Sequence, residues 1–487
     1  MSERIRFEAD RPVVLRGGTV LPMDDGRRVL TGTDVLVVGD RIAAVGPGLP
    51  VPEGTAEIDA TDGIVMPGMI DTHRHMWQTA MRGYGADWTL TQYFIWYYLE
   101  HGRLFRPEDI HAGNVLAAAE ALDAGVTTVV DWSHGLQTAD HADAAVDALR
   151  SVPGRFVLAY GNIQRAPADW TAAPEFRDFV RRRITGDDML GFQLAFDVTG
   201  DPEFPERPAF EVARDLGVAV TTHAGVWGAT SDDGIRLMYD HGFMNADTVY
   251  VHAASLSADS YHRIAATGGS VSISTESEQS AGQGYPPTWG IRAHGIPVSL
   301  SMDTSVWWSG DLFSAMRSTL GADRSREHLE AHAKGDTVTH SGLRAEQVVD
   351  WATRGGARAL GRDGDLGALE AGRKADVVLI KNEHSPVSFP LLNPYGHVAF
   401  QAQRGDVHTV LVNGRVVKHE HRLLGVDLAA ARRAVERTVE HLRSTMGEAE
   451  WRKGMNPDIP QTTLLDNPYT YTDYHSDVTH TRRESSG

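Results

Sequence analysis

The sequence predicts a closed (β/α)8 barrel of the TIM type, with a small composite β-sandwich domain built from both chain ends. Eight short apolar runs alternate with helical patterns in the middle of the chain, which is typical of parallel βα units. No Gly-x-Gly-x-x-Gly turn follows the first run, and this disfavours the alternative of an open, doubly wound sheet. Short strand patterns punctuated by glycine occupy both ends of the chain.

Residues 1–65 and 363–425 are predicted to form the β-sandwich. Strands are expected at 13–15, 34–38, 41–45, 56–58 and 63–65, and again at 375–380, 398–400, 409–412 and 415–418. Asn413-Gly414 is a strong hairpin signal between the last two. The first set lacks enough core to stand alone, so we expect the two sets to pair, with the central region inserted between them. Two unrelated β-appendages are the alternative.

Residues 66–362 are predicted to form the barrel. Its strands are expected at 64–70, 127–131, 156–160, 191–196, 219–223, 249–252, 270–274 and 298–302. Helical patterns fall between most of them, for example at 107–124 and 139–151, and Pro107 suits a helix start. The last outer helix is expected at 351–360. Chemistry in such a barrel lies at the carboxyl ends of the strands.

Residues 426–487 are predicted to contain a C-terminal helix and an extended tail. Apolar residues recur at helical spacing within 427–450, at Ala430, Val435, Val439 and Leu442. The tail from Pro457 is polar and contains three tyrosines, at 469, 471 and 474. It is interpreted either as disordered or as wrapping around a neighbouring subunit.

Composition narrows the functional class. The net charge of the 487 residues is 46 − 65 = −19, which argues against nucleic acid or an anionic membrane as a partner and leaves a small-molecule substrate. The chain has no cysteine, so any metal must be bound by His, Asp or Glu. The N-terminus has no apolar signal core and no run approaches a membrane span, so we expect a cytoplasmic protein.

Five residues with metal-binding or acid–base chemistry stand at the predicted strand ends. His73 and His75 follow the first strand, and they face the same way because side chains alternate along a strand. His223, His252 and Asp303 end the fifth, sixth and eighth strands. Each histidine alone could be an ordinary barrel residue. Together at one rim, the five residues indicate a divalent metal site.

The chain resembles the amidohydrolase superfamily over nearly its whole length, most closely the branch of triazine hydrolases and guanine, cytosine and adenosylhomocysteine-type deaminases. The motifs that carry the resemblance are MPGMIDTHRH at 66–75, Gln78 with Arg82-Gly83, GVTTV at 125–129, SMD at 301–303 and GALEAGRKADVV at 367–378.

The resemblance implies roles for the strand-end residues. His73, His75, His223 and Asp303 would bind one metal, zinc by preference, with Fe²⁺ or Mn²⁺ as alternatives. His252 would orient the attacking water and steady the developing oxyanion, and Asp303 would accept the proton of that water. Binuclear members carry a bridging lysine on strand 4 or strand 3. Neither strand has a lysine here, which favours a single metal ion.

One position departs from the pattern of the deaminases. They usually have Glu three residues after the strand-5 histidine, whereas this chain has Val226. Glu276 and Glu278 follow strand 7, and Glu278 is the candidate replacement as a catalytic acid. A solvated acidic loop is the alternative. Without a replacement, a leaving group that departs unprotonated is easier, as in hydrolytic dehalogenation.

Aromatic residues are predicted to line the substrate pocket. Tryptophans follow several strand ends or lie in rim loops, and aromatic walls with few charges suit a planar heteroaromatic substrate. Gln78 and Arg82 could bond polar ring edges, and His134 is either a substrate contact or a plain loop residue. The predicted substrate-binding set is Gln78, Arg82, Trp77, Trp88, Trp132, His134 and Trp307; Trp96, Trp227, Trp289 and Trp308 are further candidates for the wall.

The sequence thus predicts a metal-dependent hydrolase acting on non-peptide carbon–nitrogen bonds of a small cyclic or heteroaromatic compound. The alternatives are a dehalogenase, lyase or cyclase of secondary metabolism on the same metal site, and a non-catalytic barrel scaffold. By analogy with the resembled branch, we expect a homo-oligomer, either a dimer or a tetramer.

Overall fold

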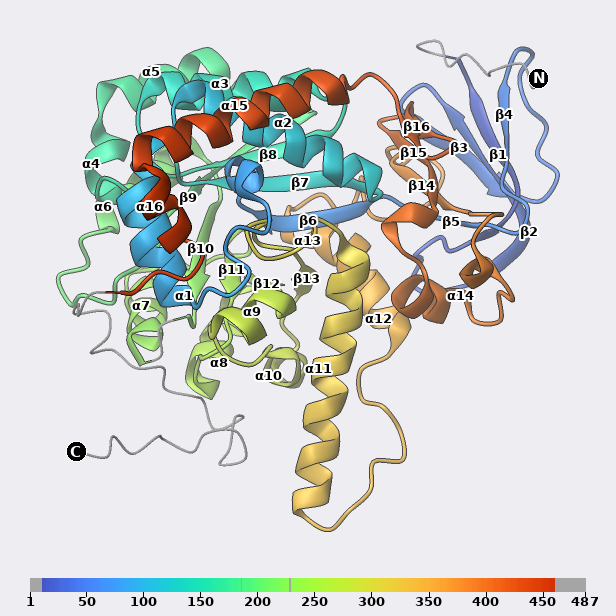
Figure 1. The fold of residues 1–487 in the computed structure, drawn as a ribbon. Coiled ribbons are helices and arrows are strands. Elements are labelled where there is room, and N and C mark those ends of the chain that lie inside the picture. Colours follow the sequence, from blue (N-terminus) through green and yellow to red (C-terminus); the bar gives the residue numbers. More distant parts are fainter. Residues whose placement is uncertain (1–10, 185, 227–228, 460–487) are drawn as a thin grey trace.

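The computed structural model describes residues 11–184, 186–226 and 229–459, and these residues form a barrel beside a mixed sheet (Figure 1). The barrel strands run in chain order and neighbouring strands are parallel. They are β6 (Met69–Arg74), β7 (Val126–Ser133), β8 (Arg155–Tyr160), β9 (Leu190–Ala195), β10 (Val220–Ala224), β11 (Val249–His252), β12 (Ser270–Ile273) and β13 (Val298–Leu300). The predicted eight-stranded barrel is confirmed.

The first and last strands close the barrel at the predicted site. An isolated parallel bridge joins Arg74 to Asp303. The amide of Asp303 donates to the carbonyl of His73 at 3.1 Å, and the amide of His75 donates to the carbonyl of Asp303 at 2.8 Å. Barrel closure therefore fixes the backbone of three predicted metal ligands relative to one another.

The barrel interior below this rim contains a chain of buried hydroxyl groups. The Oγ1 atom of Thr72 lies 2.8 Å from Ser272 Oγ and 2.7 Å from Ser299 Oγ. Ser301 Oγ lies 2.8 Å from Ser272 Oγ and 2.7 Å from Ser274 Oγ. Buried hydroxyls cost free energy unless they are hydrogen-bonded, and here they satisfy one another. This network links β6, β12 and β13 beneath the site.

Helices surround the barrel and extend its rim (Figure 1). Pro107 begins α2, as predicted, because a first-turn residue needs no amide donor. The last outer helix begins at Ala345, earlier than the predicted residue 351. The helices between β6 and β7 are η1 (Met76–Met81), α1 (Leu90–Gln92), the π-helix η2 (Tyr93–His101), η3 (Gly102–Leu104) and α2 (Pro107–Asp123). Those that follow are α3 (Ala139–Ser151), α4 (Pro167–Ala172), α5 (Pro174–Arg183), α6 (Arg207–Leu216), α7 (Ala229–Asp240), α8 (Ala258–Thr267), α9 (Thr275–Ala281), α10 (Thr288–His294), α11 (Leu312–Ala333), α12 (Ala345–Asp350), η4 (Trp351–Gly355) and α13 (Gly356–Ala359).

The two chain ends share the mixed sheet, as predicted. β14 pairs with β5 in antiparallel register, with Val377 opposite Pro67. Leu15 and Leu379 belong to one buried cluster, so the two ends build a common core. The strands are β1 (Val13–Val20), β2 (Leu30–Val38), β3 (Arg41–Gly46), β4 (Ala56–Asp59), β5 (Ile64–Pro67), β14 (Val377–Ile380), β15 (Val407–Val412), β16 (Arg415–His419) and β17 (Arg422–Leu423). Between β14 and β15 lie η5 (Pro386–Ser388), α14 (Pro394–Gly396), η6 (His397–Gln401) and η7 (Arg404–Asp406).

Two predicted strands are wrong. The run 64–70 is two strands in two sheets, β5 and β6, separated at Gly68. A Cβ atom on Gly68 would lie 2.1 Å from Thr127 Oγ1, so the chain passes β7 too closely for any side chain at this position. The run 398–400 lies in the π-helix η6, because a three-residue apolar run does not distinguish a strand from a buried helix.

The predicted C-terminal helix is present as α15 (Leu428–Met446), followed by α16 (Glu448–Lys453). Gly447, at φ 81°, separates the two helices. The tail from residue 460, with the tyrosines at 469, 471 and 474, lies outside the described residues, so both interpretations of it stay predictions. Among the helices of the described ranges, none combines the length and apolarity needed to cross a membrane.

Candidate metal centre

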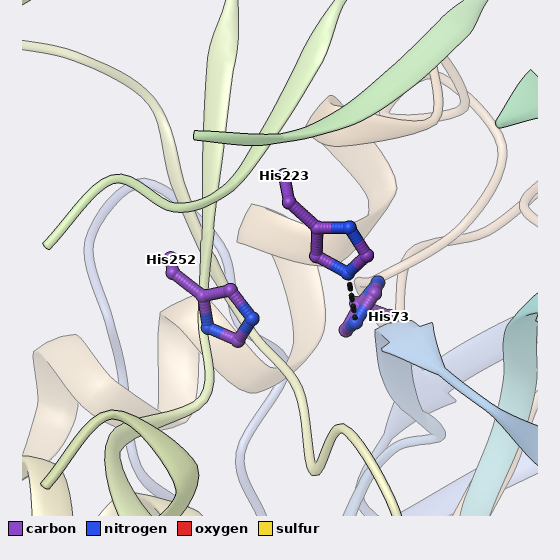
Figure 2. A group of neighbouring side chains, drawn as sticks. All are labelled: His73, His223 and His252. Atoms are coloured by element: carbon purple, nitrogen blue, oxygen red, sulfur yellow. Dashed lines mark hydrogen bonds between the residues drawn. The ribbon is translucent and has the colours of Figure 1, made fainter. Parts of the chain in front are cut away.

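Four side chains from three strand ends converge at the rim of the barrel. His73 Nε2 and His75 Nε2 lie 3.3 and 3.4 Å from Asp303 Oδ1. His223 Nε2 lies 3.4 Å from His73 Nε2, and Figure 2 shows these two nitrogens facing each other. Ligands placed tetrahedrally at zinc distances are about 3.3 Å apart. His73, His75 and Asp303 therefore lie at spacings that suit one zinc-sized ion, and His223 joins this group through its contact with His73.

The remaining polar atoms of these ligands are held by neighbouring groups. His75 Nδ1 lies 2.8 Å from the carbonyl oxygen of Trp132, and His223 Nδ1 lies 2.9 Å from Asp197 Oδ1. Such contacts fix the tautomer that leaves Nε2 free to bind a metal. Ser277 Oγ donates to Asp303 Oδ2, so Oδ1 is the oxygen turned toward the histidines. Three imidazoles and one carboxylate form a donor set that suits zinc.

Burial keeps His73 and His75 neutral, the form in which a histidine binds a cation. It lowers the pKa of His75 to about 4 and the pKa of His73 well below its usual value. Burial alone would raise the pKa of Asp303, but the hydrogen bond with His73 and the nearby histidines hold it well below the usual range. Burial alone would lower the pKa of His223, but the carboxylate of Asp197 raises it. The carboxylate anion of Asp303 beside the neutral imidazoles of His73 and His75 suits the binding of a cation.

His252 lies beside the four ligands and is held differently. One of its ring nitrogens lies within 4.8 Å of ring nitrogens of His73 and His223 (Figure 2). Its Nδ1 faces Glu278 Oε1 at 3.4 Å. The φ angles of His252 and Asp303 are 70° and 65°, in the left-handed region that costs free energy for residues other than glycine. Strained backbone at both positions is typical of a functional site.

The two carboxylates after strand 7 lie on α9 rather than in a solvated loop. Glu278 is fully buried, accepts from the amide of Ser274 at 2.8 Å, and lies behind His252 rather than on the cavity wall. Burial raises the pKa of Glu278. Glu276 accepts from Ser314 on α11, and burial raises its pKa to about 7. The structure thus brings Glu278 to His252 and leaves Glu276 away from the site.

A cavity opens beside the predicted metal ligands. His134 lines it, and the ring of His134 packs against Tyr98 with the centroids 4.0 Å apart. The wall is mostly aromatic and aliphatic, which suits a planar ligand with few charges. Besides His134, the lining residues are His75, Leu90, Tyr93, Phe94, Tyr98, Asp197, His223, Val226, His252, Gln283 and Asp303.

The other predicted substrate-binding residues lie behind the wall and support it. Gln78 Nε2 donates to the hydroxyl of Tyr93 at 2.7 Å, and Trp307 packs on Tyr93 with ring centroids 4.8 Å apart. Trp77 Nε1 lies 3.2 Å from Nδ1 of His134.

Trp132 packs against His223, with the ring centroids 4.1 Å apart, and does not line the cavity. Trp88 is buried behind the wall. Trp289 is exposed on α10 and Trp227 lies outside the described residues. The predicted tryptophan wall is therefore largely a second layer behind the residues that line the cavity.

Arg82 does not reach the cavity, and the prediction of a direct substrate contact needs correction. Its guanidinium binds the carboxylate of Glu120, which Arg74 and Arg404 also bind. A buried carboxylate attracts cations strongly, and the partners of this one come from parts of the chain that sequence spacing does not connect.

Sequence reasoning missed part of the cavity wall. Leu90, Tyr93, Phe94 and Tyr98 come from α1 and η2, an insertion between β6 and α2. The aromatic run at 93–98 (YFIWYY) was the available signal. Asp197 was also missed, although it closely follows β9 and therefore had to lie at the rim.

Comparisons with known proteins show the family of the chain. The model of the Amidohydrolase family matches residues 64–417. The 5-methylthioadenosine/S-adenosylhomocysteine deaminase of Desulforudis audaxviator is 30% identical over 448 residues, covering 88% of this chain and 99% of the relative. The 5'-deoxyadenosine deaminase of Methanosarcina barkeri is 25% identical over 440 residues, covering 88% of this chain and 98% of the relative.

Solved structures show the same fold. Atrazine chlorohydrolase from Arthrobacter aurescens, complexed with zinc, matches with a TM-score of 0.75 at 23% identity, over 88% of this chain and 100% of that one. An adenosine deaminase from Xanthomonas campestris with bound zinc matches with a TM-score of 0.74 at 23% identity, over 89% and 98%. The sequence and fold together place the chain in the amidohydrolase family, and the predicted enzyme class, a hydrolase of non-peptide carbon–nitrogen bonds, is confirmed.

Proposed function

We propose that this protein hydrolyses the bond between an exocyclic nitrogen and a ring carbon of a planar heteroaromatic compound, with one zinc ion bound by His73, His75, His223 and Asp303. The observation that carries the proposal is that these four side chains meet at the barrel rim, each in contact with another of them, beside an aromatic cavity. The deaminase names of the relatives support an aminopurine, of the adenosine type, as the first substrate to test.

Each residue around the cavity would have its own role in the proposed hydrolysis. A divalent cation held by the four ligands would lower the pKa of a water molecule to about 7. Asp303 would accept the proton of the attacking water and pass it toward the leaving nitrogen. His252 would donate from Nε2 to the oxygen on which charge develops, provided that its Nδ1 accepts from a protonated Glu278, a form that burial of Glu278 favours. Tyr93 and Tyr98 would hold the ring of the substrate in the cavity.

A second candidate function rests on Val226. This side chain lines the cavity and has no acidic proton to donate. The resembled deaminases have a carboxylate at this position. Glu278 could reach a leaving group only through His252. A halide leaves without a proton, whereas an amine leaves as the anion only at high cost. Hydrolytic dehalogenation of a ring carbon therefore needs no acid opposite the metal, whereas deamination needs one.

The two candidates are distinguished by their products. The experiment is a panel of adenosine derivatives, aminopyrimidines, triazines and lactams, read out for ammonia and for chloride, on protein of measured metal content. Release of ammonia supports deamination, and release of chloride alone supports dehalogenation. The His73→Ala variant should lose both metal and turnover. Full turnover by protein shown to be free of metal would falsify the metal-dependent mechanism.

The assembly and location are also proposals. We propose a cytoplasmic homo-oligomer, a dimer or tetramer, and domain boundaries at residues 65–66, 362–363 and 425–426. Light scattering during size-exclusion chromatography tests the first, and limited proteolysis tests the boundaries. A monomer at micromolar concentration would overturn the assembly proposal.

A further inference from the structure

The aromatic wall of the cavity has two faces, and only one of them reaches the substrate. In the π-helix η2, residues five apart lie above one another, so Tyr93 and Tyr98 face the cavity together. Their rings stack at 5.8 Å with an interplanar angle of 16°. Trp96, between them in sequence, points to the opposite face and is buried there. The wall is thus a single helix with a substrate face and a back face.

The back face is hydrogen-bonded to the C-terminal segment. Trp96 Nε1 donates to Glu450 Oε1 on α16 at 3.1 Å. Trp88 Nε1, just before α1, donates to the carbonyl of Gly454 at 2.8 Å. In Figure 1, α16 descends from the end of α15 and lies beside α1. Two indoles that each find a partner on the same short segment fix the distance between the wall and α16.

Two further side chains extend this contact on either side. Gln92 Nε2 donates to Asn456 Oδ1 at 2.9 Å and to the carbonyl of Pro457 at 3.0 Å. The hydroxyl of Tyr84 donates to the carbonyl of Trp451 at 2.6 Å, and the two rings pack with centroids 4.7 Å apart. The contact therefore runs along the whole of α16 and the residues that follow it.

The packing leaves no room for a side chain at Gly454. A Cβ atom there would lie 2.0 Å from Trp96 Cη2 and 2.2 Å from the hydroxyl oxygen of Tyr84. The φ angle of Gly454 is −61°, which any residue adopts, so the side chain is excluded by space and not by backbone conformation.

The segment that holds the wall is itself anchored on the barrel. The hydroxyl of Thr438, on α15, donates to Asp109 Oδ1 at 2.7 Å, at the start of α2. His441 Nε2 lies 3.1 Å from the carbonyl of Leu104. α15 thus ties α16 to a rigid barrel helix. Because π-helices are rare and mostly limited to a single turn, we expect η2 to depend on such support.

We propose that α16 is a positioning element of the substrate pocket: it holds η2 from behind, at the distance from the metal ligands that a planar heteroaromatic ring requires. The nature of the ligand rests on the function proposed above, whereas the support of η2 by α16 does not. The hydrogen bonds of α16 described above reach the back face of the wall and not the four metal ligands. The effect should therefore fall on substrate binding and leave metal binding intact.

The Gly454→Ala variant tests the proposal, with Gly321→Ala as its matched control. Gly321 lies exposed on α11, and a Cβ atom there would meet no described atom within 4 Å. The same chemical change at this position should therefore leave exchange at 90–101 and KM unchanged. Hydrogen exchange measured by mass spectrometry should show faster exchange across residues 90–101 in Gly454→Ala, by about tenfold. With a substrate from the panel, KM should rise about tenfold while kcat changes less, because binding geometry and not the metal is altered.

A milder variant covers the case in which Gly454→Ala does not fold. Trp88→Phe keeps a buried aromatic ring, although a smaller one, and removes the donor to Gly454, so it should accelerate exchange at 90–101 in the same direction. Unchanged exchange in the folded variants would overturn the proposal, and so would loss of metal from them. Hydrogen exchange needs no turnover, so the proposal can be judged even if every compound of the panel fails as a substrate.

Discussion

The Nδ1 atom of His223 lies 2.9 Å from Oδ1 of Asp197, and the same oxygen accepts from the amide of His223 at 3.1 Å. One carboxylate just after β9 thus holds both the ring and the backbone of a predicted metal ligand on β10. This contact leaves His223 Nε2 turned toward His73. Support of this kind is what gives a metal site its affinity.

Asp197→Asn should weaken metal binding without abolishing it. The amide can still contact the ring but no longer supplies charge, and loss of such a partner costs about 10–100-fold in metal affinity. Titration with a competing chelator measures the change. Asp215→Asn, on the exposed side of α6, is the matched control and should bind metal as the wild type does. Equal affinity in the two variants would remove Asp197 from the account of the site.

Glu120→Gln should destabilise the fold. Glu120 is buried and its carboxylate binds the guanidinium groups of Arg74, Arg82 and Arg404. Removing one partner of a buried ion pair leaves uncompensated charge and costs about 3–5 kcal/mol. Denaturant unfolding measures the loss, and Glu53→Gln, on an exposed turn, should change little. A loss below about 1 kcal/mol, the range of surface pairs, would contradict the assignment.

The difference in unfolding free energy between the wild type and Glu120→Gln should become smaller as the pH falls. Burial alone would raise the pKa of Glu120, but Arg74 and Arg82 lower it to about 2. Because the folded-state pKa is depressed, the stabilisation is complete above the unfolded value of about 4.5 and is lost as the pH falls toward 2. Unfolding free energies should therefore converge as the pH falls through this window. A difference in unfolding free energy that stays constant over this pH range would show that it does not arise from the charge of Glu120.

Val226→Glu should favour deamination over dehalogenation. Val226 lines the cavity beside His223, so a carboxyl group there could protonate a leaving amine. General acid catalysis contributes about 10²–10⁴-fold, and part of this should appear as a higher ratio of ammonia to chloride release. Val226→Ala changes the volume without adding an acid and should leave the ratio unchanged. The same ratio in both variants would mean that the missing acid is supplied elsewhere.

The convergence of the strand-end side chains could be predicted from the sequence because each of these residues ends or follows a strand of the barrel. Parallel strands bring their carboxyl ends to one rim, so His73, His75, His223, His252 and Asp303 converge without any knowledge of side-chain contacts. The pairing of the chain ends followed similarly, because the first set of strands was too small for a core of its own.

The cavity wall could not be predicted in the same way. The run at 93–98 is aromatic throughout, apart from one isoleucine, so its pattern does not say which rings face the substrate; the π-helical register decides that. Arg82 is 38 residues from Glu120 in sequence, and only the packing of η1 against α2 brings them together. The apolar run 64–70 is divided between two sheets at Gly68, where the close approach of Thr127 excludes a side chain, and the sequence does not reveal this contact.

The metal content of the purified protein tests the central claim most directly. Elemental analysis of the wild type and of His73→Ala, alongside the exposed His340→Ala as a control, reports whether the four side chains form one site. The account predicts one divalent ion per chain in the wild type and the control, and a large loss in His73→Ala. The same metal content in all three proteins, or none in an active wild type, would contradict it.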